Sequence, residues 1–352
     1  MIDTENITYP APKEKYKVLV RCFTFNQSKY IEDTLNGFAM QQTDFPFVCL
    51  VMDDASTDGE QEVIKNWMDR ECDMSRAETI YIPTSVIIIV PHKTNTTCTF
   101  AFYLLTKNLY RAKELKMSHV TPWRQECEYE AICEGDDYWI DHLKLQKQVN
   151  FLDSNSDYGM CYTRAMVIKE NEETTIIGTP ILNLNTFLRS NVIATLTVCL
   201  RSELMRRYCE EVSPEKHNWL MGDYPIWFWI YLNSKIHYID EITSVYRILK
   251  ESASHSTQVE RQISFIESAY DIRAYYIKWY LNNDKQLFDI VNVVRVWSIF
   301  RAIIATGDER RAFEYINNHL TELPFKYQLC CMLMKYSKLI RRYMSLRFNK
   351  IA

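Results

Sequence analysis

The chain of 352 residues is long enough for one large α/β domain and a smaller appended module. Its 47% hydrophobic and 24% charged residues are ordinary for a globular protein, and its 7 glycines and 10 prolines argue against long disordered linkers. The formal net charge of −4 provides no global basic field, so we expect no nucleic-acid partner.

Cysteine usage and the N-terminal sequence both indicate a cytoplasmic protein. The 11 cysteines include no Cys-x-x-Cys pair, so neither a disulfide framework nor a zinc site is expected. The polar N-terminus does not have the pattern of a signal peptide. The longest apolar runs, 86–90 and 224–232, are too short to span a bilayer.

Strands and helices alternate along the first half of the chain. The predicted strands are residues 16–23, 47–52, 86–90, 129–133 and 159–167, and the predicted helices are 30–41, 60–68, 100–115 and 142–152. This alternation predicts a doubly wound α/β fold with a mostly parallel sheet. Ligands bind beyond the carboxyl ends of such strands, where the motifs TFNQS, DDASTDG and EGDDYW follow.

The pattern changes after His255, where only helices are predicted. Their ranges are 259–281, 287–306, 310–320 and 327–348. We therefore expect two domains, an α/β domain of residues 1–255 and a helical C-terminal module of residues 256–352.

Two carboxylates, Asp53 and Asp54, directly follow the predicted strand 47–52. In a structural interpretation the segment is a turn, and Ser56 or Asp58 caps the next helix. That interpretation does not account for two like charges at one strand tip, which repel each other unless a ligand binds. Carboxylates at this position can accept hydrogen bonds from a uracil N–H and from ribose hydroxyls.

Glu134, Asp136 and Asp137 place three more carboxylates after the predicted strand 129–133. A solvated acidic turn is one interpretation, but such a cluster is costly unless a cation compensates its charge. Gly135 allows the backbone to come close to a ligand. A hard divalent cation, Mg²⁺ or Mn²⁺, with phosphate oxygens completing its shell, fits this pattern.

Asp223 precedes a very apolar segment and has two interpretations. It can cap the following helix, with Pro225 in the first turn, or it can be a partly desolvated general base with a raised pKa. His255 is either a metal ligand or a structural residue, and Arg247 is a candidate to neutralise phosphate charge. The chain has no GxxxxGK[ST] and no GxGxxG motif, which argues against ATPase and dinucleotide-binding functions.

Four segments together resemble the family 2 glycosyltransferases of bacterial surface polysaccharide synthesis. They are VRCFTFNQSKYIEDTLNGFAMQ, VMDDASTDG, ICEGDDYWIDHLKLQKQ and MGDYPIW, and they cover roughly residues 16–255. The resemblance implies a GT-A fold, an inverting single displacement, a UDP-sugar or other nucleotide-sugar donor, and Mn²⁺ or Mg²⁺.

The resemblance also implies roles for individual residues. Donor binding would fall to Thr24, Asn26, Asp53, Asp54, Glu134 and Asp136. Metal binding would fall to Asp136 and Asp137, and the catalytic base would be Asp223. Apart from the resemblance, His255 is a candidate as a further metal ligand or as a contact for the diphosphate. Glu134 departs from the family's D-x-D pattern, in which the first acidic residue is Asp, and Gly222 stands where the family often has Glu. The acceptor, a glycan or a lipid-linked glycan, would lie over Trp139, Thr195 and Tyr224.

Two functions of other classes remain as alternatives. A sugar-nucleotide nucleotidyltransferase would need a Gly- and Arg-rich loop after the first strand, which FTFNQSKY lacks. A non-catalytic sugar-binding protein on the same fold would not need Asp223 beside an intact acidic cluster.

The C-terminal residues 323–352 contain basic side chains and no Asp or Glu. The basic residues are Lys326, Lys335, Lys338, Arg341, Arg342, Arg347 and Lys350. The apolar residues Leu329, Tyr336 and Tyr343, with Met332, Leu339 and Leu346, recur every seven positions and predict one helical stripe. The stripe either packs on the helical module or lies at the inner face of the membrane as a peripheral contact with anionic lipid.

Overall fold

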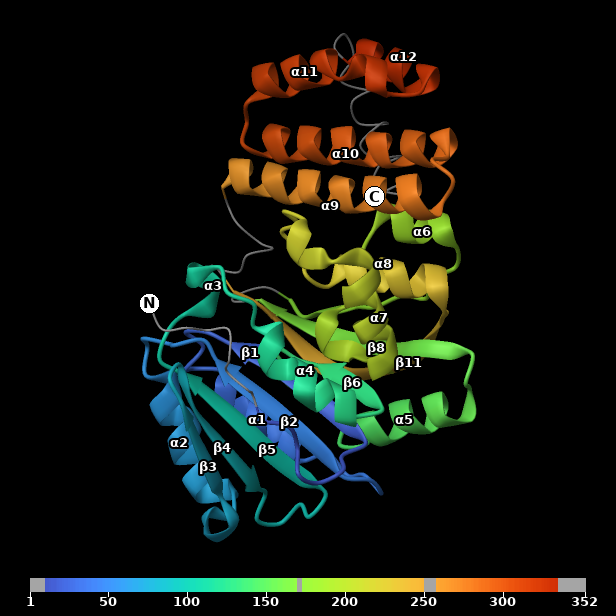
Figure 1. Cartoon of the computed structure of the whole chain (residues 1–352). Coiled ribbons are helices and arrows are strands. Elements are labelled where there is room, and N and C mark those ends of the chain that lie inside the picture. Colours follow the sequence, from blue (N-terminus) through green and yellow to red (C-terminus); the bar gives the residue numbers. More distant parts are fainter. Residues whose placement is uncertain (1–9, 170–172, 250–257, 335–352) are drawn as a thin grey trace. The chain divides into compact units, whose positions relative to one another are not determined.

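The computed structural model describes residues 10–169, 173–249 and 258–334, which divide into two compact units (Figure 1). The first unit contains residues 1–179, 193–211 and 234–247, and the second contains 180–192, 212–233 and 248–352. Within these ranges, the structure describes only the residues given above. Both units are therefore discontinuous in sequence.

A mixed sheet with the strand order β3-β4-β5-β2-β1-β6-β10-β8-β11-β7 forms the centre of the first unit, and β9 pairs with β8. The strands are β1 (Val18–Thr24), β2 (Phe47–Asp53), β3 (Glu78–Ile82), β4 (Ser85–Pro91), β5 (Cys98–Leu105), β6 (Tyr129–Ile132), β7 (Tyr138–Trp139), β8 (Tyr158–Lys169), β9 (Thr175–Ile177), β10 (Val198–Arg201) and β11 (Lys235–Ile248). The neighbours β5, β2, β1 and β6 are parallel, and antiparallel strands flank them on both sides.

Helices cover both faces of the parallel strands. The helices of this unit are α1 (Ile31–Ala39), α2 (Glu60–Glu71), α3 (Leu109–Ala112), α4 (Met117–Glu126), α5 (Lys144–Ser154) and α7 (Ser202–Val212, whose last residue belongs to the second unit). Val18 and Val20 of β1 pack in one core with α1, α2 and α5, whereas Leu19 packs in a second core with α3 and α4. Alternate side chains thus enter opposite cores, which explains why these strands are continuous apolar runs in the sequence.

The predicted helix at residues 100–115 is wrong. Residues 98–105 form the buried strand β5, and only the short helix α3 follows within the predicted range. The segment CTFAFYLL is rich in aromatic residues and pairs with β2 on one side and β4 on the other, so it packs as a central strand. A short apolar run cannot be assigned to helix or strand by periodicity alone.

The second unit is helical over its described residues. Its helices are α6 (Leu184–Arg189), α8 (Tyr224–Asn233), α9 (Val259–Tyr280), α10 (Lys285–Ala305), α11 (Glu309–Asn318) and α12 (Phe325–Met334). Helix α10 packs against α9, α11 and α6, and α8 packs against α9. The predicted C-terminal helices are confirmed as α9, α10, α11 and the first part of the last one, whose residues 335–348 lie outside the described ranges.

The second unit begins earlier in the sequence than the expected boundary at residue 255. It includes the loop and helix at 180–192 and the segment 212–233, which carries Asp223 and α8. The sequence pattern places these segments in the α/β domain because they lie between its strands. Their packing partners are α9 and α10, which come later in the chain.

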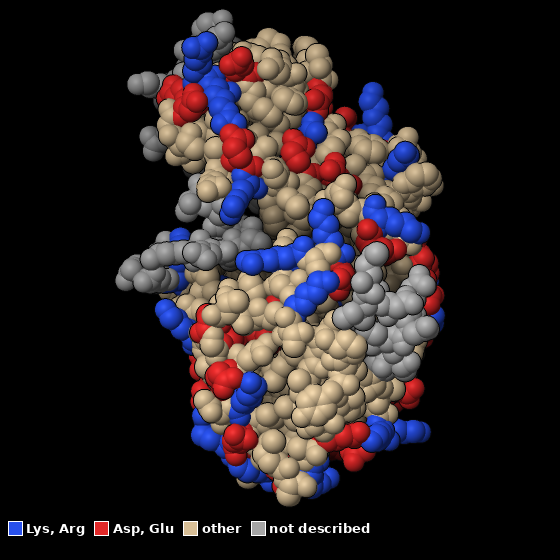
Figure 2. Space-filling model, turned by 60° about the vertical axis from the view of Figure 1, so that its left-hand side comes forward, with Lys and Arg blue, Asp and Glu red and all other residues tan. Residues whose placement is uncertain are grey.

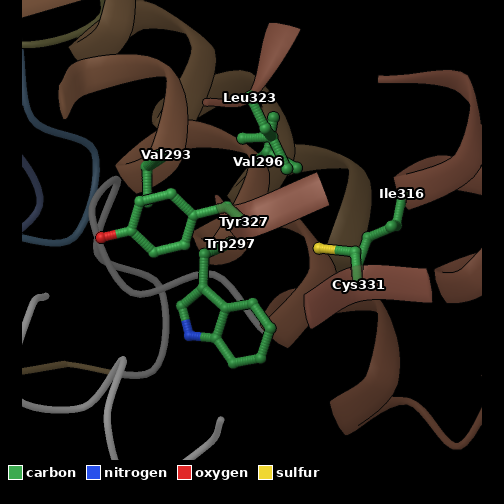
Figure 3. A pocket seen from close by; sticks show the side chains of 7 residues that line it. All are labelled: Val293, Val296, Trp297, Ile316, Leu323, Tyr327 and Cys331. Carbon is green, nitrogen blue, oxygen red and sulfur yellow. The ribbon is translucent and has the colours of Figure 1, made fainter. Parts of the chain in front are cut away.

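A small cavity in the second unit is part of its packed core (Figure 3). Its volume is about 10 Å³, which is room for about one water molecule. The lining residues are Val293, Val296, Trp297, Ile316, Leu323, Tyr327 and Cys331. Mostly apolar side chains in so small a space do not suit a substrate.

The surface carries charges of both signs, and the helices lack membrane-spanning character. Acidic and basic side chains are interspersed over the face in Figure 2. Within the described ranges, none of the helices combines the length and the apolar character that crossing a bilayer requires.

Candidate functional site

The loops after β1 and β2 are joined by hydrogen bonds at the carboxyl edge of the sheet. Thr24 and Asp53 end these two parallel strands and are paired in the strand register. The Asn26 backbone N–H donates to Ser56 Oγ at 2.8 Å, and the Thr57 N–H donates to Asn26 Oδ1 at 2.8 Å. Asn26 adopts a left-handed backbone with φ of 55°, a conformation that Asn tolerates better than most residues. The motifs TFNQS and DDASTDG therefore lie at the carboxyl ends of parallel strands, as the sequence predicts.

Glu60, in the first turn of α2, is the buried centre of this junction and was not identified from the sequence. Its carboxylate accepts the Gln27 N–H at 2.7 Å and the Ser56 hydroxyl at 2.9 Å, and it contacts the Thr24 hydroxyl. Burial raises the pKa of Glu60 although these hydrogen bonds oppose the shift. In the sequence Glu60 resembles an ordinary acidic residue at a helix N-terminus.

Asp53 has one oxygen satisfied by the protein and one that is not. Its Oδ1 accepts the Ser56 N–H at 3.0 Å and the Gln61 side-chain N–H at 2.6 Å. Its Oδ2 is buried and has no hydrogen-bond partner among the described residues. A buried carboxylate oxygen without a donor is costly, so a ligand N–H at this oxygen would be stabilising. Asp53 has 0% exposure, so a ligand reaches this oxygen only if the surrounding loops move.

Asp54 does not fit the donor-binding role expected for it. Its carboxylate accepts the N–H groups of Leu109 and Tyr110 at 2.6 and 3.2 Å, and it forms an ion pair with Lys116 at 2.8 Å. Only 1% of Asp54 is exposed. Asp54 therefore holds the N-terminus of α3, and its surroundings differ from those of Asp53.

The acidic loop after β6 lies against the end of β1. A Cβ atom at Gly135 would lie 2.2 Å from Thr24 Oγ1 and 2.6 Å from Gln27 Oε1, so only glycine fits there. The Thr34 hydroxyl of α1 lies 2.9 Å from the Gly135 carbonyl oxygen and 2.6 Å from that of Asp137. The three loops that carry the predicted motifs consequently lie next to one another.

Asp136 and Asp137 are carboxylates whose charge is destabilised by their surroundings. Burial raises the pKa of Asp136, while Arg247 and a hydrogen bond from Gln27 oppose the shift. Burial raises the pKa of Asp137 well above its usual range, the Asp136 charge adds to this, and the Arg247 N–H opposes it. Asp136 is partly exposed, whereas Asp137 is 3% exposed.

Arg247 fixes the acidic loop rather than presenting a free cation. Its backbone N–H donates to Asp137 Oδ1 at 2.8 Å, and its Nη1 donates to the Asp136 carbonyl oxygen at 2.8 Å. Its guanidinium also pairs with Asp33 and lies 4.2 Å from the centroid of the Tyr138 ring. With these partners, Arg247 orients the Asp137 carboxylate and holds the Asp136 backbone in place.

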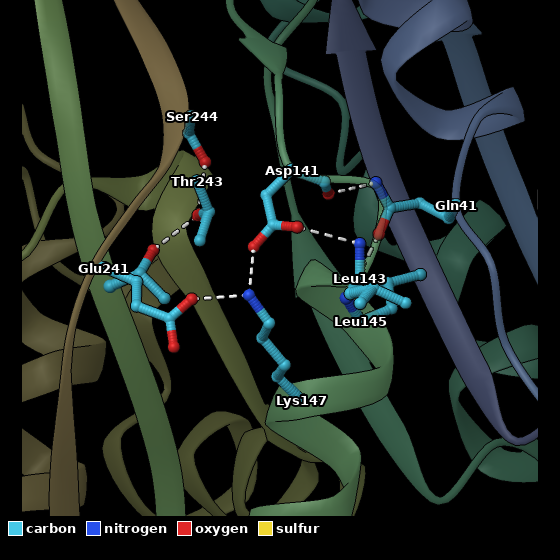
Figure 4. A network of polar contacts seen from close by, with 9 residues as sticks. Gln41, Asp141, Leu143, Leu145, Lys147, Glu241, Thr243 and Ser244 are labelled. Carbon is cyan, nitrogen blue, oxygen red and sulfur yellow. Dashed lines mark hydrogen bonds and ion pairs between the residues drawn. The ribbon is translucent and has the colours of Figure 1, made fainter.

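A polar network holds the chain after β7 in place (Figure 4). Lys147 bridges Asp141 at 2.8 Å and Glu241 at 2.5 Å, which joins α5 to β11. The Gln41 side chain donates to the Asp141 carbonyl oxygen at 2.9 Å and accepts the Leu145 N–H at 3.1 Å. This network therefore anchors the chain that follows the acidic loop and β7, in addition to the contacts of the loop itself.

Trp139 is a core residue, and its expected role in acceptor binding is wrong. It is 1% exposed, its Nε1 donates to the Leu196 carbonyl oxygen at 2.9 Å, and its ring centroid lies 4.8 Å from that of Phe38. The Lys144 ammonium lies 4.3 Å from the Trp139 ring centroid. A sugar therefore has no access to this ring. Thr195 is half-buried in the short 3₁₀ helix Thr195–Thr197 of the first unit.

Asp223 and Tyr224 belong to the second unit. The half-buried Asp223 accepts a hydrogen bond from Asn191 Nδ2 at 3.2 Å, and its carbonyl oxygen accepts the Trp227 N–H at 3.1 Å at the start of α8. Tyr224 is fully buried, donates to the Phe187 carbonyl oxygen at 2.8 Å and accepts from Arg273 at 2.9 Å. The expected acceptor role of Tyr224 is therefore wrong. His255 lies outside the described residues.

Two carboxylates of the first unit, Asp136 and Asp137, are candidates for a divalent-metal site. Among the described residues, no three His, Cys, Asp or Glu side chains are grouped as a ready-made metal site. Mg²⁺ and related cations are commonly held by one or two carboxylates together with substrate phosphates and water. The two hydrogen-bonded carboxylates of Asp136 and Asp137, with raised pKa values, fit this kind of shared site.

Comparison with other sequences finds relatives over half of the chain. Rv1520 of Mycobacterium tuberculosis and Mb1547 of Mycobacterium bovis, both described as uncharacterized proteins, are each 30% identical to this chain over 185 residues. The match covers 51% of this chain and 45% of each relative, so it spans about half the length of these relatives. No family model matches the chain.

Two solved structures are similar to this one over most of its length. S. aureus TarS 1–349 in complex with UDP-GlcNAc has a TM-score of 0.51 at 16% identity, covering 88% of this chain and 82% of that chain. The mannosyltransferase PcManGT from Pyrobaculum calidifontis, in complex with GDP-Man and Mn²⁺, has a TM-score of 0.51 at 14% identity, covering 96% and 85%. At such low identity these similarities establish the fold alone: the chain has the GT-A type of α/β fold that the sequence predicts.

Proposed function

We propose that this chain is a metal-assisted glycosyltransferase that takes a nucleotide diphosphate sugar as donor. The observation that carries the proposal is the pair Asp136 and Asp137 after β6, two carboxylates whose pKa values burial raises, at the strand edge where Asp53 ends β2. A base that donates an N–H, such as uracil, would satisfy Asp53. A diphosphate would bring the charge that a metal held by Asp136 and Asp137 compensates.

The remaining donor-side residues have supporting roles in this proposal. Thr24 and Asn26 shape the loop under the nucleotide, because their polar groups join β1 to the β2 loop. Glu134 lies in the same acidic loop and is half-buried, so it is a candidate contact for the donor. Asp54 has no role in donor binding here, since its carboxylate holds α3.

The proposed reaction is an inverting transfer in one displacement. Asp136 and Asp137 would hold Mn²⁺ or Mg²⁺, which when bound supplies charge stabilisation for the leaving diphosphate. Asp223 would take the proton of the acceptor hydroxyl as that oxygen attacks the anomeric carbon. Asn191 orients the Asp223 carboxylate through its 3.2 Å hydrogen bond.

The ligands of the two structural neighbours support this choice of donor. TarS 1–349 is bound to UDP-GlcNAc, and PcManGT is bound to GDP-Man and Mn²⁺. Both ligands are nucleotide diphosphate sugars, and both uracil and guanine carry a ring N–H that a carboxylate such as Asp53 can accept.

Calorimetry of UDP binding in the presence of Mn²⁺ tests the donor site. We expect Asp136→Ala and Asp137→Ala each to abolish the metal-dependent part of UDP binding. Asp157→Ala is a matched control, because Asp157 is an exposed acid that pairs with Lys235 at 2.5 Å. Unchanged affinity in both loop variants would contradict the metal assignment.

The transfer step is tested by measuring the products formed from UDP-GlcNAc with and without Mn²⁺. We expect metal-dependent release of UDP. Asp223→Asn should retain UDP binding and lose about 10²–10⁴-fold in transfer rate, because it removes a general base at constant size. Release of pyrophosphate from UTP and a sugar phosphate would instead indicate a nucleotidyltransferase.

We also propose a peripheral membrane contact through residues 323–352, of which 335–352 lie outside the described residues. Phe325, Leu329 and Met332 of α12 are 78%, 50% and 46% exposed, and the basic residues of this segment suit anionic lipid. A lipid-linked glycan would be an acceptor at such a surface. Equal co-sedimentation of the full chain and a chain ending at Leu323 with anionic liposomes would exclude this contact.

A further inference from the structure

Three half-buried rings gather beside the loop that leads to Asp223 in the second unit. His217 and Trp219, on this loop, are stacked with ring centroids 4.1 Å apart and planes at 8°. Tyr275 of α9 meets both rings edge-on, with centroid distances of 4.8 and 5.3 Å. We call His217, Trp219 and Tyr275 the aromatic cluster.

The aromatic cluster differs in exposure from the rings beneath it. Tyr276 and Phe228 have 0% exposure, and their ring centroids lie 4.7 Å apart in the contact between α8 and α9. The three rings of the cluster remain partly exposed above them. Packing of α8 on α9 therefore accounts for the buried rings but not for a stacked pair of rings at the surface.

Hydrogen bonds fix the loop that carries His217 and Trp219. The His217 Nε2 lies 3.2 Å from the Val212 carbonyl oxygen, and the Leu220 N–H donates to Ser268 Oγ of α9 at 2.7 Å. Ser213 has φ of 51°, a left-handed conformation in which the loop turns away from α7. A loop held at several points presents its rings in one arrangement and loses little entropy when a ligand binds.

The same loop ends at the residue proposed as the catalytic base. Asp223 follows Trp219 by four positions and is held by Asn191 at 3.2 Å. All these residues belong to one unit, so the geometry that relates the aromatic cluster to Asp223 is internal to that unit. A ligand on the cluster would therefore have a fixed relation to the carboxylate.

We propose that the aromatic cluster binds a pyranose ring of the acceptor glycan, next to the sugar whose hydroxyl reacts. The C–H face of a sugar ring is apolar and packs on the electron-rich face of an aromatic ring, and the imidazole nitrogen and tyrosine hydroxyl nearby can hydrogen-bond to sugar hydroxyls. The cluster consists of two aromatic rings and an imidazole and includes no Lys or Arg, which suits a neutral sugar better than a phosphate. This inference rests on the proposed function, because it assigns the acceptor side of the same reaction.

Saturation-transfer NMR with the methyl glycosides of glucose, galactose, mannose and N-acetylglucosamine at millimolar concentrations tests the site. We expect ring-proton signals for at least one glycoside with the wild-type protein and their loss in Trp219→Leu, which keeps apolar bulk without an aromatic face. Trp219→Phe should restore part of the signal. Trp279→Leu is the control, because Trp279 is 65% exposed on the same helix α9 and lies outside the cluster.

The outcomes separate this inference from the proposed function. Binding of UDP with Mn²⁺ should be the same in wild type, Trp219→Leu and Trp279→Leu, since the donor residues belong to the other unit. No glycoside signal with the wild type, or an equal signal in Trp219→Leu, would overturn the aromatic site. Absence of UDP binding in the wild type would overturn the proposed function, whether or not a glycoside binds at Trp219.

Discussion

At the scale of single residues, the adjacent carboxylates Asp53 and Asp54 have different hydrogen-bond partners because their neighbours differ. Asp53 keeps a buried oxygen without a donor among the described residues, whereas Asp54 is saturated by two backbone N–H groups and Lys116. The sequence pattern assigns both residues the same donor-binding role. The donors that reach Asp54 come from residues 109–116, which no local pattern identifies.

The pair Asp53 and Asp54 allows a direct prediction. Asp53→Asn should weaken UDP binding about 10- to 100-fold, because a hydrogen bond to a charged group contributes about 1.5–3 kcal/mol. Asp54→Asn should leave UDP affinity unchanged and lower the melting temperature, because it weakens the anchor of α3. Titration calorimetry and thermal unfolding of both variants measure the two effects. Weaker UDP binding in Asp54→Asn, with unchanged UDP binding in Asp53→Asn, would contradict the roles assigned to the two residues.

Lys144 gives a prediction for the pH dependence of stability. It has 0% exposure and donates to Gln148 Oε1 at 2.7 Å, and burial lowers its pKa to about 8. Below that pKa the folded state carries a buried charge that the unfolded chain solvates better. Between pH 8 and about 10.5 the unfolded state binds more protons, so this contribution to stability increases with pH. The full shift corresponds to about 3 kcal/mol.

Lys144→Met removes the buried ammonium at similar length. The difference in free energy of unfolding between this variant and the wild type should therefore change with pH, the wild type gaining relative to the variant as pH rises from 7 to 10. Urea denaturation at several pH values measures this difference and cancels the titration of other groups. If the difference in free energy of unfolding did not change with pH, burial would not lower the pKa of Lys144.

At the scale of elements, the parallel strands β1, β2 and β6 and the antiparallel strands β4 and β8 could be predicted, and several other elements could not. Strands β1, β2, β4, β6 and β8 correspond to predicted runs because each is a compact apolar segment bounded by polar turns. The sequence pattern predicts a helix in place of strand β5, and it predicts no strand at β3, β7, β9, β10 or β11. These strands owe their conformation to neighbours in the sheet, since antiparallel partners complete their hydrogen bonds.

Gly135 tests the contact between two elements, the end of β1 and the loop after β6. Gly135→Ala would place a Cβ within 2.2 Å of Thr24 Oγ1, so the acidic loop must move. We expect a loss of stability of about 1–3 kcal/mol and weaker UDP binding with Mn²⁺. Gly222→Ala is the matched control, because a Cβ there would meet nothing within 4 Å. If the two variants had the same stability and the same UDP affinity, the acidic loop after β6 would tolerate the added methyl group at Gly135.

At the scale of the whole molecule, the division into units does not follow the order of the sequence. The Tyr276 hydroxyl of α9 donates to the Pro225 carbonyl oxygen at 2.7 Å, and Arg273 donates to the Tyr224 hydroxyl at 2.9 Å. Helix α8, apolar on all sides, is therefore buried by a helix that begins only at Val259. Helices of this composition are stable only when they are covered.

A chain ending at residue 255 tests this division. We expect it to be poorly soluble and to bind the dye ANS, because removal of α9 and α10 exposes the buried face of α8, including Trp227 and Phe228. Solubility, ANS fluorescence and the cooperativity of thermal unfolding compared with the full chain measure the effect. A well-folded 1–255 fragment with the melting temperature of the full chain would support the boundary expected from sequence.

The sequence by itself determined the class of fold and the motifs at the edge of its sheet. Apolar runs that alternate with amphipathic segments require a sheet covered on both faces, and polar residues directly after parallel strands must meet at one edge. These properties are local, so Asp53, Asp136 and Asp137 could be found without coordinates. Only the tertiary structure decided which of these carboxylates is saturated, that Trp139 and Tyr224 are buried, and that α8 belongs with α9. Burial and hydrogen-bond partners depend on residues distant in the chain, and no periodicity within one segment records them.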